Sequence, residues 1–248
     1  MKEQLSEIWQ FPGSTRKELE LLLEETKLRK DKKADEFNRF LQYMLEEFDF
    51  EGFDAQLFKH RPSGQIARTG PIKFLELTRW LPPRFYRALD LELNGSTPKV
   101  IFDLGTGLGY FPYICRYFGH SIQTIDVDEC EIFNDMINLL GIPRTVHRIR
   151  PGKSLPSFGY KFDIVTAFMV TFNAKNSNEL YGEEDWDFFL TDILDNILNP
   201  GGLLFMEMND QKRHQRGLHH KDPGFNSMLK RLGVTFRKHR QYVWIQRF

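Results

Sequence analysis

Cysteine, net charge and long apolar runs are all scarce in this chain of 248 residues. Its two cysteines, Cys115 and Cys130, form no CxxC pair and cannot hold zinc without help from histidine. Lys plus Arg (34) equal Asp plus Glu (34), so the chain is no polyelectrolyte. No run approaches the ~18 apolar residues of a membrane span, and the first ten residues lack a signal-peptide core. We therefore expect a cytoplasmic protein with reduced thiols, no metal site and no membrane partner.

Apolar and charged residues occur at ordinary globular levels, 41% and 27%, which excludes a disordered or collagen-like chain. Phenylalanine is abundant, with 23 residues against 4 Trp and 8 Tyr. So many rings predict an aromatic core. Charge is uneven along the chain, because residues 210–248 hold 10 basic and 2 acidic side chains, a net +8. This basic segment could meet an anionic substrate or neutralise the acidic middle of the same fold.

The first part of the chain reads as helical. Apolar spacing predicts helices from Thr15 to Phe48, with Thr15 and Glu18 as a capping box. Two short helices, Ile72–Trp80 and Arg84–Leu93, are expected on either side of two consecutive prolines. The turn-rich stretch after Leu93 predicts a domain boundary, with an N-terminal helical cap over residues 1–97 and a main domain over residues 98–248.

From residue 99 onward, short apolar runs alternate with amphipathic segments, which is typical of βαβ units and a parallel sheet. We expect an α/β fold of the Rossmann-like kind, with helices on both faces and an antiparallel last strand. Seven strands are predicted: Val100–Leu104, Ser121–Asp126, Thr145–Ile149, Phe162–Phe168, Gly202–Met208, Val234–Lys238 and Gln241–Phe248.

A glycine-rich turn follows the first of these strands, with the sequence DLGTGLG from Asp103 to Gly109. Glycines allow a tight turn and close approach to a ligand, and the helix that follows favours negative charge. The third glycine of a dinucleotide-binding fingerprint is replaced by Tyr110. A carboxylate at Asp103 opposes a pyrophosphate but suits a ligand with an ammonium group. The turn therefore favours a nucleoside that carries an amino acid.

A second carboxylate, Asp126, ends the next strand, 21 residues after Gly105. At this spacing an acid can accept hydrogen bonds from both ribose hydroxyls. The alternative is that Asp126 or Asp128 caps the following helix.

In these motifs the stretch from Lys99 to Asn209 resembles the class I S-adenosylmethionine-dependent methyltransferases. The strand Phe162–Phe168 and the turn Leu198–Gly202 match the family as well. The resemblance implies a seven-stranded sheet and S-adenosylmethionine as the cofactor, with S-adenosylhomocysteine as the product. It also implies a set of cofactor-binding residues: Asp103, Leu104, Gly105, Thr106, Gly107, Asp126, Val127, Ala167 and Phe168. The acid that many relatives use to bind adenine after the third strand is absent here, where the segment reads RIRPGK.

Residues beyond the carboxyl ends of the strands are the candidates for the acceptor site. Asn173, Glu207 and Asn209 are predicted to contact the substrate, and His219 with His220 is the candidate general base. No Asn/Asp-Pro-Pro-Phe/Tyr motif follows the fourth strand and no Pro-Cys nucleophile exists. These absences argue against amino methylation of adenine or glutamine and against methylation of cytosine C5.

The sequence thus predicts a methyltransferase acting on a small molecule, with a hydroxyl as one acceptor. RNA or protein methylation through the basic C-terminal segment stays open, as does a non-catalytic relative that only binds the nucleoside. A nicotinamide-dependent oxidoreductase is disfavoured by Tyr110 and Asp103. Nucleic acid is a possible partner that the sequence does not favour, and the oligomeric state is not predicted.

Overall fold

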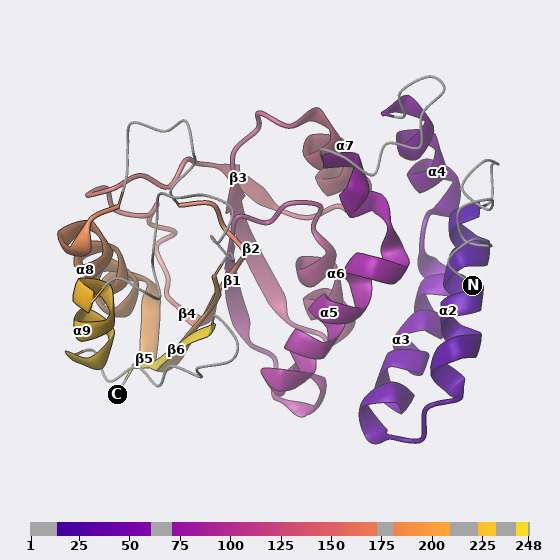
Figure 1. Cartoon of the computed structure of the whole chain (residues 1–248), viewed down its shortest axis with the longest axis horizontal. Coiled ribbons are helices and arrows are strands. Elements are labelled where there is room, and N and C mark those ends of the chain that lie inside the picture. The colour runs from indigo at the N-terminus through magenta and orange to yellow at the C-terminus, as the bar shows by residue number, and fades with distance from the viewer. Residues whose placement is uncertain (1–13, 61–70, 173–180, 209–222, 232–241, 248) are drawn as a thin grey trace. The chain divides into compact units, whose positions relative to one another are not determined.

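The computed structural model describes residues 14–60, 71–172, 181–208, 223–231 and 242–247. The chain divides into two compact units, and every described strand belongs to the second one (Figure 1). The first unit comprises residues 1–96, 107–119 and 128–142, and the second comprises residues 97–106, 120–127 and 143–248.

The second unit is built on a six-stranded sheet with the order β3-β2-β1-β4-β5-β6. All neighbours are parallel except β5 and β6, which are antiparallel. The strands are β1 Val100–Leu104, β2 Ser121–Asp126, β3 Arg144–Val146, β4 Phe162–Phe168, β5 Leu198–Glu207 and β6 Tyr242–Gln246. This arrangement confirms the predicted Rossmann-like α/β class and the antiparallel last strand.

The predicted count of seven strands is not confirmed, because the structure describes six. The predicted strand Val234–Lys238 lies outside the described residues. The third strand was predicted at Thr145–Ile149 and ends at Val146 instead. Val146 is 54% exposed and is followed by the polar residues His147 and Arg148, so apolar burial does not support a longer strand here.

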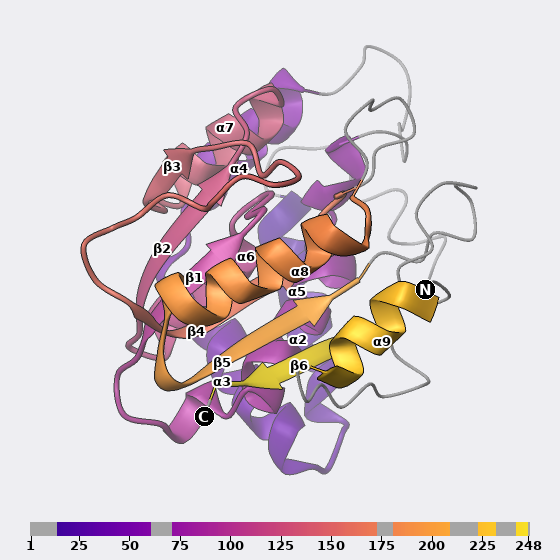
Figure 2. The same ribbon diagram turned by 90° about the vertical axis from the view of Figure 1, so that its left-hand side faces the viewer.

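One face of the sheet carries the apolar core of the second unit. Helix α8 (Glu183–Asp192), the π-helical turn η3 (Ile193–Ile197) and helix α9 (Pro223–Arg231) supply the covering side chains. Figure 2 shows α8 and α9 lying across this face. Alternate residues of the central strands, such as Phe102 and Leu104 of β1, point into this core. The residues between them, including Asp103, therefore point to the opposite face.

The first unit is helical, and many of the chain's phenylalanines lie in its core. Its core stacks Phe85 against Phe37 and Phe40, with ring centroids 4.9 and 5.0 Å apart, and all three rings are fully buried. The elements are α2 Ser14–Lys27, α3 Lys32–Glu47, α4 Phe50–Lys59, η1 Pro71–Leu75, α5 Leu77–Asp90, η2 Leu93–Gly95, α6 Tyr110–Tyr117 and α7 Glu131–Leu139. The separation of residues 1–97 as a cap domain stays a prediction, and so do helices on the second sheet face.

The predicted capping box at the start of α2 is wrong. Thr15 donates its hydroxyl hydrogen bond to Asp54 of α4, and the Glu18 carboxylate accepts from Thr78 of α5. Both side chains are buried. Contacts with other helices have replaced the local bonds, because a buried polar group must be satisfied by whatever packs against it.

The prediction that the two prolines after Leu81 separate two helices is wrong. Helix α5 runs from Leu77 to Asp90 and contains both Pro82 and Pro83. A proline costs an interior helix one hydrogen bond and a steric clash. Burial of the apolar side of α5, where Leu81 and Phe85 are fully buried, holds the helix together across them.

Among the described residues, no helix is both long and apolar enough to cross a membrane. The longest, α3, has 16 residues.

Candidate functional site

The first feature of the candidate site is the turn that follows β1. Gly105 has a φ of +70°, and its amide donates a 2.9 Å hydrogen bond to the Ile125 carbonyl of β2. A Cβ added to Gly105 would lie 2.6 Å from Cγ2 of Val170. Side chains other than hydrogen are therefore excluded here by both backbone conformation and space. Gly107 also has a positive φ, of +58°.

Asp103 is the nearly buried carboxylate just before this turn, with 2% of its surface exposed. Its Oδ1 accepts a 2.6 Å hydrogen bond from Oγ1 of Thr166, which is its register partner on β4. Thr166 is fully buried, so the bond holds the carboxylate in one orientation on the face opposite the α8 core. A carboxylate at this position attracts a cationic ligand group and repels an anionic one.

Asp126 ends β2 and is half-buried. Its Oδ1 accepts a 2.8 Å hydrogen bond from the backbone amide of Val127. Because β1 and β2 are parallel and Leu104 is paired with Ile125, Asp126 lies at the same carboxyl ends of the strands as the glycine turn. The alternative role in helix capping is not observed, since Cys130 is the N-cap of α7 and no side chain caps it.

Thr106, between the two glycines, supplies a test of whether a polar ligand fits this turn. The residue is 9% exposed, and its Oγ1 has no hydrogen-bond partner among the described residues. A buried hydroxyl without a partner costs free energy that a ligand's donor or acceptor would recover. The turn therefore fits a ligand with polar groups close to the backbone.

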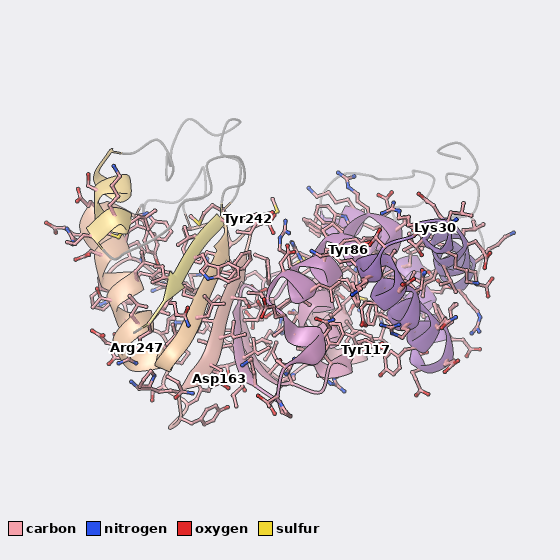
Figure 3. All side chains as sticks on the ribbon, turned by 90° about the horizontal axis from the view of Figure 1, so that it is seen from below. Lys30, Tyr86, Tyr117, Asp163, Tyr242 and Arg247 are labelled. Carbon is pink, nitrogen blue, oxygen red and sulfur yellow. The ribbon has the colours of Figure 1, made fainter. Side chains whose placement is uncertain are left out.

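Strands β4 and β5 also end on this side of the sheet. Ala167 and Phe168 end β4 and are buried, and Met169 follows them with a φ of +57°, rare for a residue other than glycine. The Met169 amide donates a 2.7 Å hydrogen bond to the carbonyl of Glu207, the last residue of β5. Figure 3 shows Tyr242 of β6 near this end of the sheet and Asp163 of β4 at the other.

In the first unit, Tyr110 begins α6 at the position where a dinucleotide fingerprint would have its third glycine. Its side chain is buried, and its hydroxyl donates a 3.0 Å hydrogen bond to the Phe74 carbonyl of η1. Burial raises the pKa of Tyr110 well above its ordinary value. The tyrosine thus ties η1 to α6, a role that a glycine could not fill.

One group of potential metal ligands occurs among the described residues, in the first unit. Nε2 of His60 lies 2.6 Å from Oδ2 of Asp135, and Glu131 is the third member. The Lys59 ammonium lies 2.7 Å from Asp135 and 2.8 Å from Glu131. Hydrogen bonds from Lys59 and His60 hold the pKa of Asp135 below its ordinary value. A lysine already supplies the cation here, so the group acts as an ion-pair cluster.

The structure thus brings several of the sequence-predicted residues together in the second unit. Asp103, Gly105, Thr106, Asp126, Val127, Ala167, Phe168 and Glu207 all lie at or beside the carboxyl ends of β1, β2, β4 and β5. The Leu104 side chain enters the apolar core, which leaves its backbone for a ligand. Asn173, Asn209, His219 and His220 lie outside the described residues.

Sequence reasoning missed Thr166, Met169 and Val170. Thr166 could have been found, because pairing β1 with β4 by their apolar patterns places a hydroxyl opposite Asp103. The positive φ of Met169 and the contact of Val170 with Gly105 have no sequence signal, since they depend on the tertiary path after β4.

No protein-family model matches the chain, and no curated protein matches it. Solved structures are similar to it. The magnesium protoporphyrin IX methyltransferase ChlM from Synechocystis PCC 6803, with bound SAM, is 14% identical with a TM-score of 0.47; the match covers 89% of this chain and 99% of that one. SAM-bound CalS10, an amino pentose methyltransferase from Micromonospora echinaspora, is 19% identical with a TM-score of 0.40, covering 54% and 53%.

A third similar structure is a TehB-like SAM-dependent methyltransferase from Corynebacterium glutamicum. It is 15% identical with a TM-score of 0.42, and the match covers 65% of this chain and 85% of that one. At these identities and TM-scores, the activity and the acceptor have to be argued from the residues of this chain.

Proposed function

We propose that this protein is an S-adenosylmethionine-dependent methyltransferase that acts on a small molecule. The observation that carries the proposal is the Asp103 carboxylate, nearly buried at the end of β1 and oriented by Thr166 beside a glycine turn. A nicotinamide dinucleotide would bring a pyrophosphate to this turn, where the carboxylate would repel it. A methionine ammonium would instead be attracted to it.

The residues of the second unit fit the parts of this cofactor. Asp103 would hold the ammonium group, while the backbone of Gly105 and the Thr106 hydroxyl would meet the polar end of the methionine moiety. Asp126 would accept the ribose hydroxyls, and its bond from the Val127 amide already orients it. Val127 would pack on adenine, with Ala167 and Phe168 as the floor.

When bound, S-adenosylmethionine supplies an electrophilic methyl carbon, to which an acceptor lone pair bonds as the carbon–sulfur bond breaks and its electron pair returns to sulfur. The chain's part in such a reaction is to orient and to exclude water. The buried strand ends at Ala167 and Phe168 provide an apolar surface for both tasks. His219 and His220 are proposed to act as the general base that takes up the proton released by the methyl acceptor.

The proposal is tested by incubating the purified protein with methyl-labelled S-adenosylmethionine and a metabolite extract, with RNA or protein added in parallel reactions. We expect label in the small-molecule fraction, and loss of that label in Asp103→Asn. The matched control is Asp187→Asn, at a half-exposed aspartate of α8 that forms an ion pair with Arg231. Label that appears only in added RNA or protein would overturn the small-molecule acceptor.

A further inference from the structure

The sheet face that carries Asp103 continues across β4, β5 and β6 in two rows of paired residues. In the first row, Asp103 is paired with Thr166, Thr166 with Phe205, and Phe205 with Trp244. Because strand side chains alternate between faces, all four point away from the α8 core, which takes Leu204, Met206, Val243 and Ile245 instead.

The second row lies one pleat closer to the carboxyl ends of the parallel strands. Glu207, the last residue of β5, is paired with Phe168 of β4 on one side and with Tyr242 of β6 on the other. Neighbouring strands lie about 5 Å apart, so each of the two aromatic residues is next to Glu207. One carboxylate-bearing residue therefore stands between two aromatic residues, on the same face as Asp103.

Four rings form what we term the aromatic ledge: Phe168, Phe205, Tyr242 and Trp244. Phe205 is its centre, with its ring centroid 5.8 Å from Phe168, 5.5 Å from Tyr242 and 5.4 Å from Trp244. Phe205 is 2% exposed and Trp244 is 37% exposed. In the aromatic ledge, Phe205 is therefore packed inside, and Trp244 is accessible to a ligand.

Carboxylates and aromatic faces attract the same kind of ligand. A carboxylate attracts a cation by charge, and a ring attracts it through the negative face of its quadrupole. An anionic ligand would be repelled by Glu207. We propose that Glu207 and the aromatic ledge bind a positively charged nitrogen of the methyl acceptor.

This assignment rests on the proposed function, which places the methyl donor beside Asp103 on the same sheet face. Glu207 lies two strands from β1, which at the usual strand spacing is roughly 10 Å across the sheet. That span suits an acceptor whose charged nitrogen is held at Glu207 while another part of the molecule reaches the donor. The cation is thus a recognition group, and the acceptor is a small amine-bearing molecule.

The test uses choline and its uncharged isostere 3,3-dimethylbutan-1-ol, titrated in ligand-observed NMR. Choline keeps its charge at every pH, so charge recognition is separated from proton transfer. Wild type, Glu207→Gln and Trp244→Leu are compared with a control, Glu184→Gln, at an exposed glutamate of α8. Each titration is run with and without S-adenosylhomocysteine, and circular dichroism shows whether the variants are folded.

We expect wild type and Glu184→Gln to bind choline about tenfold more tightly than the isostere, through charge and cation–π attraction. Glu207→Gln should abolish this preference, and Trp244→Leu should weaken choline binding about threefold. Equal binding of the two probes to wild type, an unchanged preference in Glu207→Gln, or no saturable choline binding would overturn the proposal. Choline binding that depends on Glu207 without any S-adenosylhomocysteine binding would keep the cation site and reject the methyltransferase.

Discussion

Glu18 makes the stability of the first unit depend on pH in a direction that can be calculated. Its carboxylate is 4% exposed and accepts hydrogen bonds from the Thr78 amide, at 3.2 Å, and the Thr78 hydroxyl, at 2.7 Å. The pKa of Glu18 is raised from 4.5 to about 7, chiefly by burial and also by the nearby carboxylates of Glu76 and Asp54, while the hydrogen bonds from Thr78 act to lower it.

A raised pKa means that the folded protein binds this proton more tightly than the unfolded chain does. The stabilisation is fully present below pH 4.5 and is lost as the pH rises to about 7. At 1.36 kcal/mol per pH unit, the whole shift corresponds to about 3 kcal/mol, of which about 2.5 kcal/mol falls between pH 5 and pH 8.

Glu18→Gln keeps an oxygen that can accept both bonds from Thr78 but carries no charge. Relative to wild type, its free energy of unfolding should therefore rise by about 2.5 kcal/mol between pH 5 and pH 8. The assay is urea unfolding at several pH values, followed by circular dichroism. Glu20→Gln, at an exposed glutamate of the same helix, is the matched control and should shift by only a few tenths of a kcal/mol. A difference between Glu18→Gln and wild type that stays constant with pH would refute the reasoning.

Two further predictions concern the glycine turn and its neighbour. Gly105→Ala should cost about 2 kcal/mol in unfolding free energy, because it strains a positive φ and presses on Val170, whereas Gly95→Ala has open space and should be near neutral by thermal denaturation. Thr166→Val should cost about 1–3 kcal/mol by removing the hydrogen bond to Asp103, and Thr166→Ser should restore it. Equal melting of the two alanine variants, or a valine variant as stable as wild type, would contradict these expectations.

The sheet of the second unit was predictable because its strands are short apolar runs that end at turn signals. Val100–Leu104, Ser121–Asp126 and Phe162–Phe168 have the bounds that the sequence predicted. Burial on both sides of a parallel strand leaves a continuous apolar pattern, and the carboxylates at two strand ends interrupt it visibly. Asp103 and Asp126 were recognisable for this reason.

The helical part was harder to predict because long-range packing decides its details. Thr15 and Glu18 satisfy the local rule for a capping box, yet both bind residues of other helices. Pro82 and Pro83 satisfy the local rule for a helix break, yet α5 passes through them. In each case the competing term is burial against helices far away in the sequence, which local propensity does not contain.

The arrangement of the acceptor side of the site was also hard to predict from the sequence. The sequence places Glu207 near the end of an apolar strand that faces the expected site, but its position between Phe168 and Tyr242 depends on the register of three strands. The parallel pairing of β4 with β5 and the antiparallel pairing of β5 with β6 together set that register, and no single strand encodes it.

The most direct test of the account is calorimetric titration of wild-type protein and Asp103→Asn with S-adenosylmethionine, S-adenosylhomocysteine and NADH. The account predicts that wild type binds both adenosyl ligands and not NADH, and that Asp103→Asn loses at least about tenfold in affinity for them. Failure of wild type to bind either adenosyl ligand, or binding of NADH in their place, would contradict it.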